Sequence, residues 1–194
     1  MSTPSIASQP VYAPPAWDAS GRCHVVLADG RDAAAAQALC AAAPAGPLAV
    51  VELCEGAGSW RPLLPPGARH TAAGTLATAL AALEAELARA RMGTRLYLLG
   101  SEDLIWQAWQ VATRHGLGDA EVRRHCVLTA ARPVYCVHCG HVLRGVHTNP
   151  VACTGCGRHL FVRDHFSRRL GAYMGVQIDA EAPGSLPEPV QAYP

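Results

Sequence analysis

The stretch "YCVHCGHVLRGVHTNPVACTGCGRHLF", residues 135–161, contains one pattern twice. The first copy is CVHCGHVL (136–143) and the second is CTGCGRHL (153–160), each of the form Cys-x-x-Cys-Gly-x-x-Leu. A Cys-x-x-Cys turn directs two sulfur atoms to one point, and the glycine that follows can adopt the positive φ that the turn needs. Each copy therefore predicts half of a tetrahedral metal site.

Together the copies predict one structural zinc site, with the ligands Cys136, Cys139, Cys153 and Cys156. The 13 residues between the two pairs lie near the short end of the spacing typical of four-cysteine zinc ribbons, and GVHTNP (145–150) supplies the connecting turn. Iron is the main alternative, because rubredoxin-like electron carriers use the same turns, although they generally hold them further apart in sequence. The sequence favours zinc over iron.

Disulfides and thioredoxin-like redox chemistry fit these cysteines less well. The N-terminal segment MSTPSIASQPVYAPPAW (1–17) has neither a basic nor an apolar signal region, so an oxidising compartment is not predicted. A thioredoxin-like site needs only one Cys-x-x-Cys pair, at the start of a helix. The other four cysteines stand singly in apolar stretches and are expected to be buried: Cys23, Cys40, Cys54 and Cys126.

Composition limits the function classes further. The chain has 194 residues, half of them hydrophobic, which is enough for one ordinary domain and a small appendage. The formal net charge is +1, with arginine as the only strong base. The composition therefore does not indicate an overall positive potential that would attract nucleic acid. No apolar run approaches the roughly 20 residues of a membrane span, and we expect a cytoplasmic protein.

The order of apolar runs predicts an α/β domain over residues 21–132. Strands are expected at 23–28, 48–53, 95–100 and 121–128, with helices between them that begin after Asp32, near Thr75 and after Ser101. Alternating strands and helices of this length predict a small, doubly wound, parallel, Rossmann-like sheet.

The remaining segments flank this domain or follow it. Residues 1–20 and 177–194 are rich in proline and are expected to be extended, the latter as an acidic tail. Residues 133–176 are expected to form the zinc ribbon. We expect the ribbon to be followed by a short C-terminal helix that packs through Phe166, Leu170 and Tyr173.

The segment TRLYLLGSEDLIWQAWQVATRHGLGDAEVRRHCV (94–127) resembles the end of the nucleotide-binding domain of ferredoxin-NADP reductases. The first strand, however, is followed by ADGRDAAAA (28–36), which lacks a glycine-rich loop for a pyrophosphate. The resemblance therefore implies a reductase-like domain without a functional dinucleotide loop. The alternative is a surviving nucleotide site, which would use Asp29, Gly30, Gly100 and Ser101.

The segment CGRHLFVRDHFSRRLGAYMGVQ (156–177), together with the paired cysteine turns and Asn149-Pro150, resembles the zinc-ribbon domain of the small subunit of bacterial dimethylamine monooxygenase. The resemblance implies a multisubunit, NADPH-dependent enzyme that converts dimethylamine into methylamine and formaldehyde. Haem is then expected in one partner subunit, and FMN and an iron-sulfur cluster in a reductase partner.

Within such a complex this chain is expected to act in assembly rather than catalysis. Paired arginines suit carboxylates on another subunit, and the expected partner-docking residues are His165, Arg168, Arg169 and Tyr173. The same residues could instead form the edge of a reactive pocket. A second functional class, a free-standing zinc-ribbon adaptor that contacts nucleic acid or protein, is favoured less because Asp164 interrupts the basic segment FVRDHFSRR (161–169).

Overall fold

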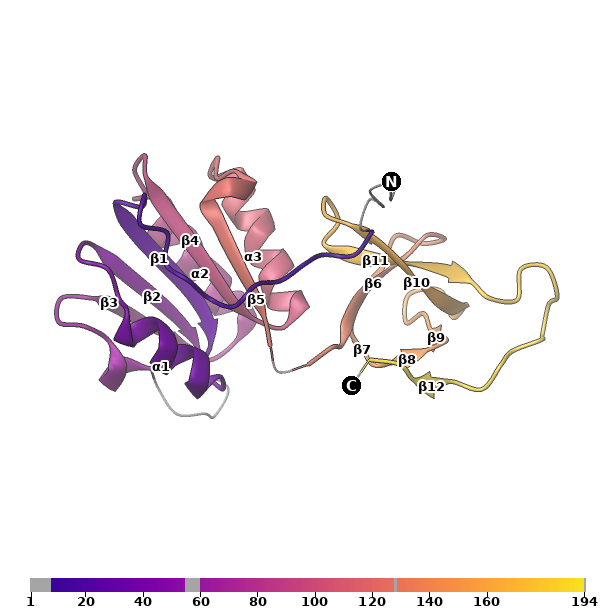
Figure 1. Ribbon diagram of the computed structural model, residues 1–194. Helices are drawn as coiled ribbons and strands as arrows, with labels where there is room; N and C mark the ends of the chain where they lie inside the picture. The colour runs from indigo at the N-terminus through magenta and orange to yellow at the C-terminus, as the bar shows by residue number, and fades with distance from the viewer. Residues whose placement is uncertain (1–7, 55–59, 128, 194) are drawn as a thin grey trace, which may run out of the picture. The chain divides into compact units, whose positions relative to one another are not determined.

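The computed structural model describes residues 8–54, 60–127 and 129–193 and divides into two compact units (Figure 1). We call residues 12–128 the α/β unit, and residues 129–194 together with 1–11 the ribbon unit. Residues 1–7 of the expected arm, Leu128 of the last expected strand and Pro194 of the tail lie outside the described residues. No helix in the described ranges is long and apolar enough to cross a membrane.

Five parallel strands form the sheet of the α/β unit, in the spatial order β3-β2-β1-β4-β5. Their bounds are β1 (Cys23–Asp29), β2 (Leu48–Leu53), β3 (Arg69–Ala73), β4 (Thr94–Gly100) and β5 (Val122–Cys126). The connecting helices are α1 (Ala33–Ala41), α2 (Leu76–Leu87) and α3 (Glu102–Arg114), and two short 3-10 turns are η1 (Arg61–Leu63) and η2 (Asp119–Glu121). The predicted doubly wound parallel sheet is confirmed.

Local sequence explains where these helices begin. The side chains of Asp32, Thr75 and Ser101 each accept a hydrogen bond from a backbone N–H of the first turn, which satisfies a donor that the helix itself leaves unpaired. β1 and β2 are buried along almost their whole length, as expected for strands covered on both faces.

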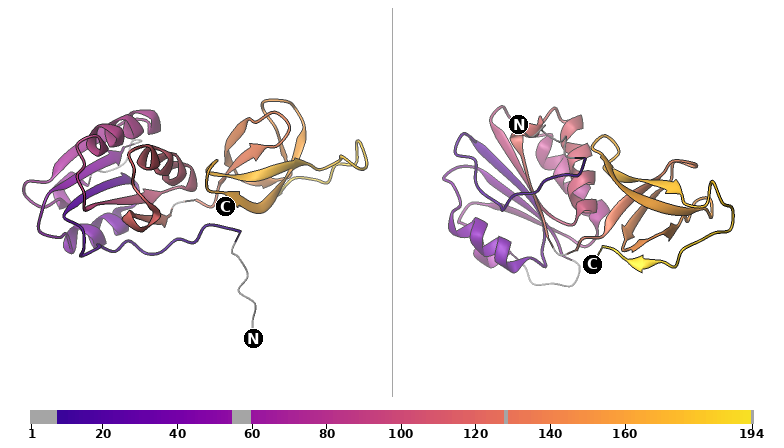
Figure 2. Two further views of the ribbon diagram at one scale, coloured as in Figure 1. Left: turned by 90° about the horizontal axis from the view of Figure 1, so that it is seen from above. Right: turned by 45° about the vertical axis from the view of Figure 1, so that its right-hand side comes forward.

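The two faces of the sheet are covered differently (Figure 2). Helices α2 and α3 pack together on one face, and α1 covers part of the other. The N-terminal arm completes that second face: Trp17 packs edge-on against Tyr97, with 4.6 Å between ring centroids, and its Nε1 donates to Leu39 O. The Asp18 carboxylate then accepts hydrogen bonds from Arg95 and Arg123. These contacts fix Trp17 and Asp18 of the arm to the sheet.

The sequence pattern did not predict strand β3. The strand has only five residues, RHTAA, which are mostly polar, and only Ala73 is buried. β3 is an edge strand that pairs with β2 alone, so little apolar periodicity is required of it.

The ribbon unit contains a second five-stranded sheet, in the order β7-β6-β11-β10-β9. Its strands are β6 (Arg132–Cys136), β7 (Val142–Val146), β9 (Val151–Ala152), β10 (His159–Ser167) and β11 (Ala172–Gln177). A separate two-stranded pair joins β8 (Thr148–Asn149) to β12 (Val190–Gln191). The expected helix after the ribbon is wrong: residues 163–173 belong to the β10–β11 hairpin. Leu160, Val162 and Phe166 are buried, and they are separated by two and four residues. These separations place all three side chains on one side of a strand.

The C-terminal tail returns to the ribbon. Tyr193 N donates to His147 O, and Tyr193 O lies 2.7 Å from His147 Nδ1. The guanidinium of Arg132 lies 4.1 Å from the ring centroids of both Tyr193 and Tyr173. Residues 178–184 of the tail form turns and bends, and residues 190–193 are held by these contacts.

Candidate metal centre and neighbouring sites

The structure brings together the sulfur atoms of Cys136, Cys139, Cys153 and Cys156, all within 4.8 Å of one another. Across the two turns, Cys136 Sγ lies 3.8 Å from Cys156 Sγ, and Cys139 Sγ lies 3.7 Å from Cys153 Sγ. Four thiolates around an ion at roughly 2.3 Å in tetrahedral geometry are separated by about 3.8 Å. The spacing of the sulfur atoms therefore fits a tetrahedral four-thiolate ion.

The two cysteine turns have the same backbone geometry. Gly140 and Gly157 have φ values of 74° and 73°, in the left-handed region that favours glycine. Gly140 N donates to Cys136 O at 2.9 Å, and Gly157 N donates to Cys153 O at 2.8 Å. The repeated glycine is thus explained by the turn that directs each pair of sulfur atoms inward.

The environment of the sulfur atoms favours negative charge at one side of the site. The backbone N–H of Arg158 lowers the pKa of the Cys156 thiol to about 6, so this sulfur is readily deprotonated. The pKa of the Cys139 thiol is raised to about 11: the backbone N–H of His141 lowers it, but burial and the hydrogen bonds from the other thiols outweigh that effect. A bound divalent cation would take the place of the protons through which the four thiols bond to one another.

The donor set fits zinc, and the same four thiolates also fit iron. The nearby His141 is exposed, and its Nε2 lies 3.0 Å from Thr154 Oγ1. Within the described ranges, no other group of three or more histidine, cysteine or acidic side chains is placed to hold a metal ion. When bound, the ion would tie the two turns together.

The four remaining cysteines lie in the α/β unit, where each is partly exposed rather than fully buried. Burial is the main cause of the raised pKa of the Cys40, Cys54 and Cys126 thiols, and it brings that of Cys126 to about 11. Such groups remain protonated near neutral pH and are poor nucleophiles.

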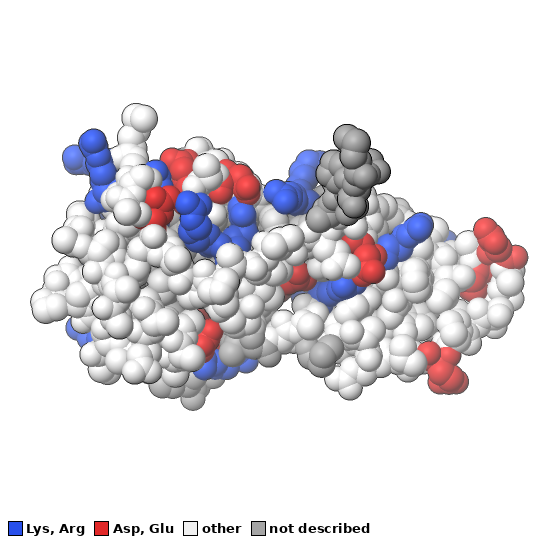
Figure 3. Space-filling model, viewed as in Figure 1, with Lys and Arg blue, Asp and Glu red and all other residues white. Residues whose placement is uncertain are grey.

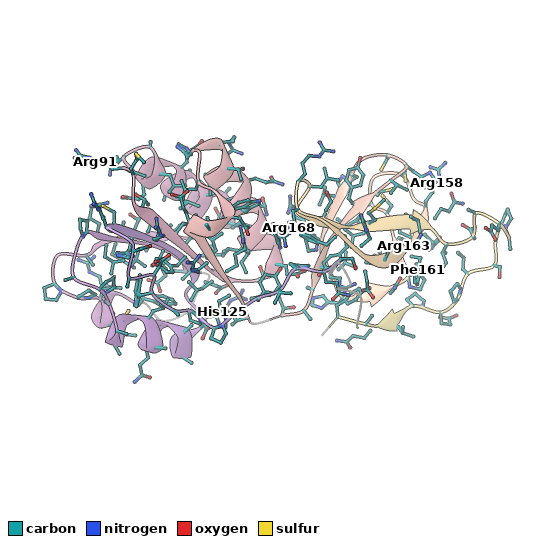
Figure 4. All side chains as sticks on the ribbon, turned by 45° about the horizontal axis from the view of Figure 1, so that its top comes forward. Arg91, His125, Arg158, Phe161, Arg163 and Arg168 are labelled. Carbon is teal, nitrogen blue, oxygen red and sulfur yellow. The ribbon has the colours of Figure 1, made fainter. Side chains whose placement is uncertain are left out.

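The expected docking residues fall into two kinds of place. His165 lies in the irregular part of β10, and Arg168 and Arg169 lie in the turn before β11; all three are exposed. Figure 4 shows Arg168 at this end of the ribbon unit. Tyr173, by contrast, is 3% exposed and packs against Phe166 with 4.9 Å between ring centroids. The first three can reach a partner, whereas Tyr173 supports the hairpin from within.

The four residues expected for a nucleotide site lie together at the carboxyl edge of the parallel sheet. Asp29 ends β1 and Gly100 ends β4, which are neighbouring strands at the point where the strand order reverses. A Cβ on Gly100 would lie 3.3 Å from Asp29 Cβ, and one on Gly30 would lie 2.8 Å from Glu52 Oε1. Both glycines therefore allow close packing at this edge.

The polar groups at this edge are engaged within the chain. The Asp29 carboxylate accepts two hydrogen bonds from the Arg31 guanidinium, at 2.9 and 2.6 Å, and Ser101 Oγ caps α3. At the first residue of α3, Glu102 Oε1 accepts a hydrogen bond from Tyr12 OH. A buried carboxylate at the start of this helix opposes the binding of a phosphate there.

One buried hydrogen-bonded pair was missed by reasoning from sequence. Glu52 in β2 is fully buried, and its Oε2 lies 2.7 Å from His70 Nε2 in β3. Its other oxygen, Oε1, accepts a hydrogen bond from Trp60 N. The only available signal was an acid within the apolar run LAVVEL (48–53). The pair joins the edge strand to the core and also holds the residue that enters η1.

Two family models match the chain. The model "Dimethylamine monooxygenase subunit DmmA-like, N-terminal domain" matches residues 4–122, and the corresponding C-terminal domain model matches residues 133–176. The boundary between the models falls near the boundary between the two structural units.

A curated relative supports the same family. The chain is 41% identical over 101 residues to the heme-dependent oxidative N-demethylase delta subunit of Ectopseudomonas mendocina (strain ymp); the match covers 52% of this chain and 58% of that relative. No solved structure matches. Since the N-terminal model alone spans more than half of the sequence, the chain belongs to the DmmA-like family of dimethylamine monooxygenase subunits.

Proposed function

We propose that this chain is the non-haem small subunit of a haem-dependent oxidative N-demethylase that acts on a secondary amine such as dimethylamine. The observation that carries the proposal is the joint match of both structural units to one family of monooxygenase subunits. The name of the 41% identical relative supports it, because that protein is a delta subunit of such an enzyme.

The overall reaction would use one O₂ and one NADPH for each methyl group removed. One oxygen atom would enter the methyl group, which leaves as formaldehyde, and two electrons and two protons would reduce the other atom to water. Haem in a partner subunit would supply the oxygen chemistry, and FMN with an iron-sulfur cluster in a reductase partner would carry the electrons from NADPH.

The role of this chain would be assembly. A ribbon tied by one zinc ion is a rigid platform, because the ion replaces much of the core that a unit of this size lacks. Arg168 and Arg169 stand exposed in the turn between β10 and β11, where their guanidinium groups suit carboxylates on another subunit. The α/β unit would contribute a scaffold, since the polar groups at its carboxyl edge already bond to one another.

The test is reconstitution. The full chain would be co-expressed with the haem and reductase subunits from its own source, and amine-dependent NADPH oxidation and formaldehyde release would be measured with and without it. The proposal predicts that the chain co-purifies with the haem subunit and that omission abolishes turnover, which returns when purified chain is added. Full activity without the chain, together with no co-purification, would contradict the proposal.

A further inference from the structure

The ribbon sheet has a second side, which neither the metal centre nor the exposed arginine pair explains. It carries the side chains of Tyr135 in β6, Phe161 in β10, and Met174 and Val176 in β11. We call these four residues the outer face. They come from three neighbouring strands of one sheet.

The strand register places these side chains beside one another. Phe161 pairs with Val176, and Met174 pairs with Tyr135. Gly175 lies between the two β11 residues and points to the opposite side, where a Cβ would lie 2.8 Å from Val134 Cγ1 and 2.9 Å from Leu160 Cδ1. Because side chains alternate along a strand, the outer face is the side away from the packed core.

The outer face is partly open. Phe161 is 44% exposed, and Tyr135, Met174 and Val176 are each half-buried. Val137, directly after β6, is 39% exposed and donates its N–H to Gly175 O, which extends the apolar surface. Single exposed apolar side chains are ordinary, but a continuous group across three strands is typical of an interaction site.

The nearest charge on the same side of β10 is positive. Arg163 follows Phe161 by two residues in β10 and is exposed, and Figure 4 labels the two side chains beside each other. Arg158, by contrast, donates from its Nε to Gln177 Oε1 at 3.1 Å. The three strands contain one acid, Asp164, which accepts a hydrogen bond from Arg132 at 2.8 Å. On the face of the ribbon unit that Figure 3 shows, positive and negative groups are scattered among uncharged residues.

We propose that the outer face binds a companion subunit of the proposed demethylase, through an apolar patch of that subunit bordered by Asp and Glu side chains. Such a patch would bury Phe161 and its neighbours at the centre and place a carboxylate opposite Arg163. The inference rests on the proposed function and adds a second contact surface, separate in sequence from the turn that carries Arg168 and Arg169.

Two other occupants fit the charges less well. A second copy of this chain related by a two-fold axis would bring two Arg163 side chains into one interface, which costs free energy. A nucleic acid strand gains most of its affinity from many phosphate contacts, and one arginine beside one exposed aromatic ring supplies few.

The test is oxidative footprinting of the full chain, alone and in the reconstituted complex. Hydroxyl radicals oxidise Met174 and Phe161 in the free chain, and Met92, 97% exposed in the α/β unit, serves as the internal control. We expect oxidation of Met174 and Phe161 to fall severalfold in the complex while that of Met92 stays the same. Equal oxidation of Met174 and Phe161 in an intact complex would overturn this inference and leave the proposed function standing.

A pair of variants gives a second readout. Phe161→Asp should weaken complex formation by about tenfold or more, as expected for a central aromatic contact. Leu63→Asp changes an equally exposed residue of the α/β unit and should have no effect. Mass doubling by light scattering, or binding of a single-stranded RNA oligonucleotide, that is lost in Phe161→Asp would assign the face to a second copy or to nucleic acid and overturn the proposal. Failure of any complex to form would overturn both this inference and the proposed function.

Discussion

The sulfur atom of Cys136 lies 3.8 Å from that of Cys156, although 19 residues separate the two cysteines in sequence. Each of these cysteines belongs to a different turn, so the contact joins β6 to the segment that enters β10. An ion at this point would hold together the two halves of the ribbon sheet. The stability of the ribbon unit should therefore depend on the metal, whereas that of the α/β unit should not.

The first prediction concerns the ion. The purified chain should be colourless and contain about one zinc per chain, and Cys139→Ser should unfold the ribbon unit while leaving the α/β unit folded. Metal analysis and amide hydrogen exchange across both units check this. Cys40→Ser, in α1 and outside the site, is the matched control and should keep the zinc. A red protein with a reversible iron couple would show that the chain carries electrons instead.

The second prediction concerns pH. His24 is buried beside Tyr97, with His24 Nδ1 3.0 Å from Tyr97 OH, and burial, helped by the charge of Arg95, lowers the pKa of its imidazole below 6.5. The folded chain therefore prefers the neutral ring. Stability from this group is complete above pH 6.5 and is lost as pH falls from 6.5 through the folded-state pKa. The melting temperature of His24→Gln should fall less than that of the wild type over this range; equal falls would exclude His24 as the cause.

The third prediction concerns the C-terminal tail. Arg132→Ala removes the guanidinium between the rings of Tyr173 and Tyr193 and its ion pair with Asp164, which should cost the ribbon unit about 1–3 kcal/mol of unfolding free energy. Amide exchange of residues 190–193 should become faster. Arg169→Ala, an exposed change in the same unit, should leave both quantities unchanged. Unaltered exchange in Arg132→Ala would mean that the β8–β12 pairing and the Tyr193–His147 contacts hold the tail without Arg132.

The fourth prediction concerns nucleotides. The isolated chain should show no thermal protection by NADPH, since a ligand at 100 times its dissociation constant would add about 2.7 kcal/mol of stability. The polar groups of Asp29 and Ser101 are engaged by Arg31 and by the backbone of α3. A dose-dependent rise in melting temperature that Asp29→Asn and Ser101→Ala abolish would instead establish a nucleotide site at the carboxyl edge.

Sequence patterns predicted the parts of the fold that depend on local periodicity and helix capping. The apolar runs gave β1, β2 and β4, and Asp32 and Ser101 marked the starts of α1 and α3. The cysteine spacing predicted that four sulfur atoms lie together, as they do in the structure. In each case the information lies in neighbouring residues or in a fixed geometric requirement of the turn.

The errors arose where long-range contacts decide the structure. β3 has little apolar pattern, because it pairs on one side and is held by the Glu52–His70 pair. The segment that carries Phe166, Leu170 and Tyr173 was expected to form a short helix, yet it belongs to the β10–β11 hairpin, and Asp164 in β10 accepts a hydrogen bond from Arg132 in β6. The outer face was not predicted either, since it is formed only when β6, β10 and β11 become neighbours.

The central claim, that the ribbon unit docks this chain into a demethylase complex, is tested most directly by reversing the charge of the exposed arginine pair. Arg168→Glu with Arg169→Glu should oppose partner carboxylates and can cost several kcal/mol at a close interfacial pair. A matched variant, Arg91→Glu with Arg114→Glu, makes the same change on the exposed surface of the α/β unit.

The deciding measurement is the mass of the reconstituted complex together with its amine-dependent NADPH oxidation, as a function of added subunit. The account predicts that the Arg168/Arg169 variant folds and binds zinc, that its complex dissociates and turnover is lost, and that excess variant partly restores activity, whereas the control variant behaves as the wild type. A complex of normal mass and affinity whose turnover alone collapses would contradict docking and place Arg168 and Arg169 in the active site or the electron path.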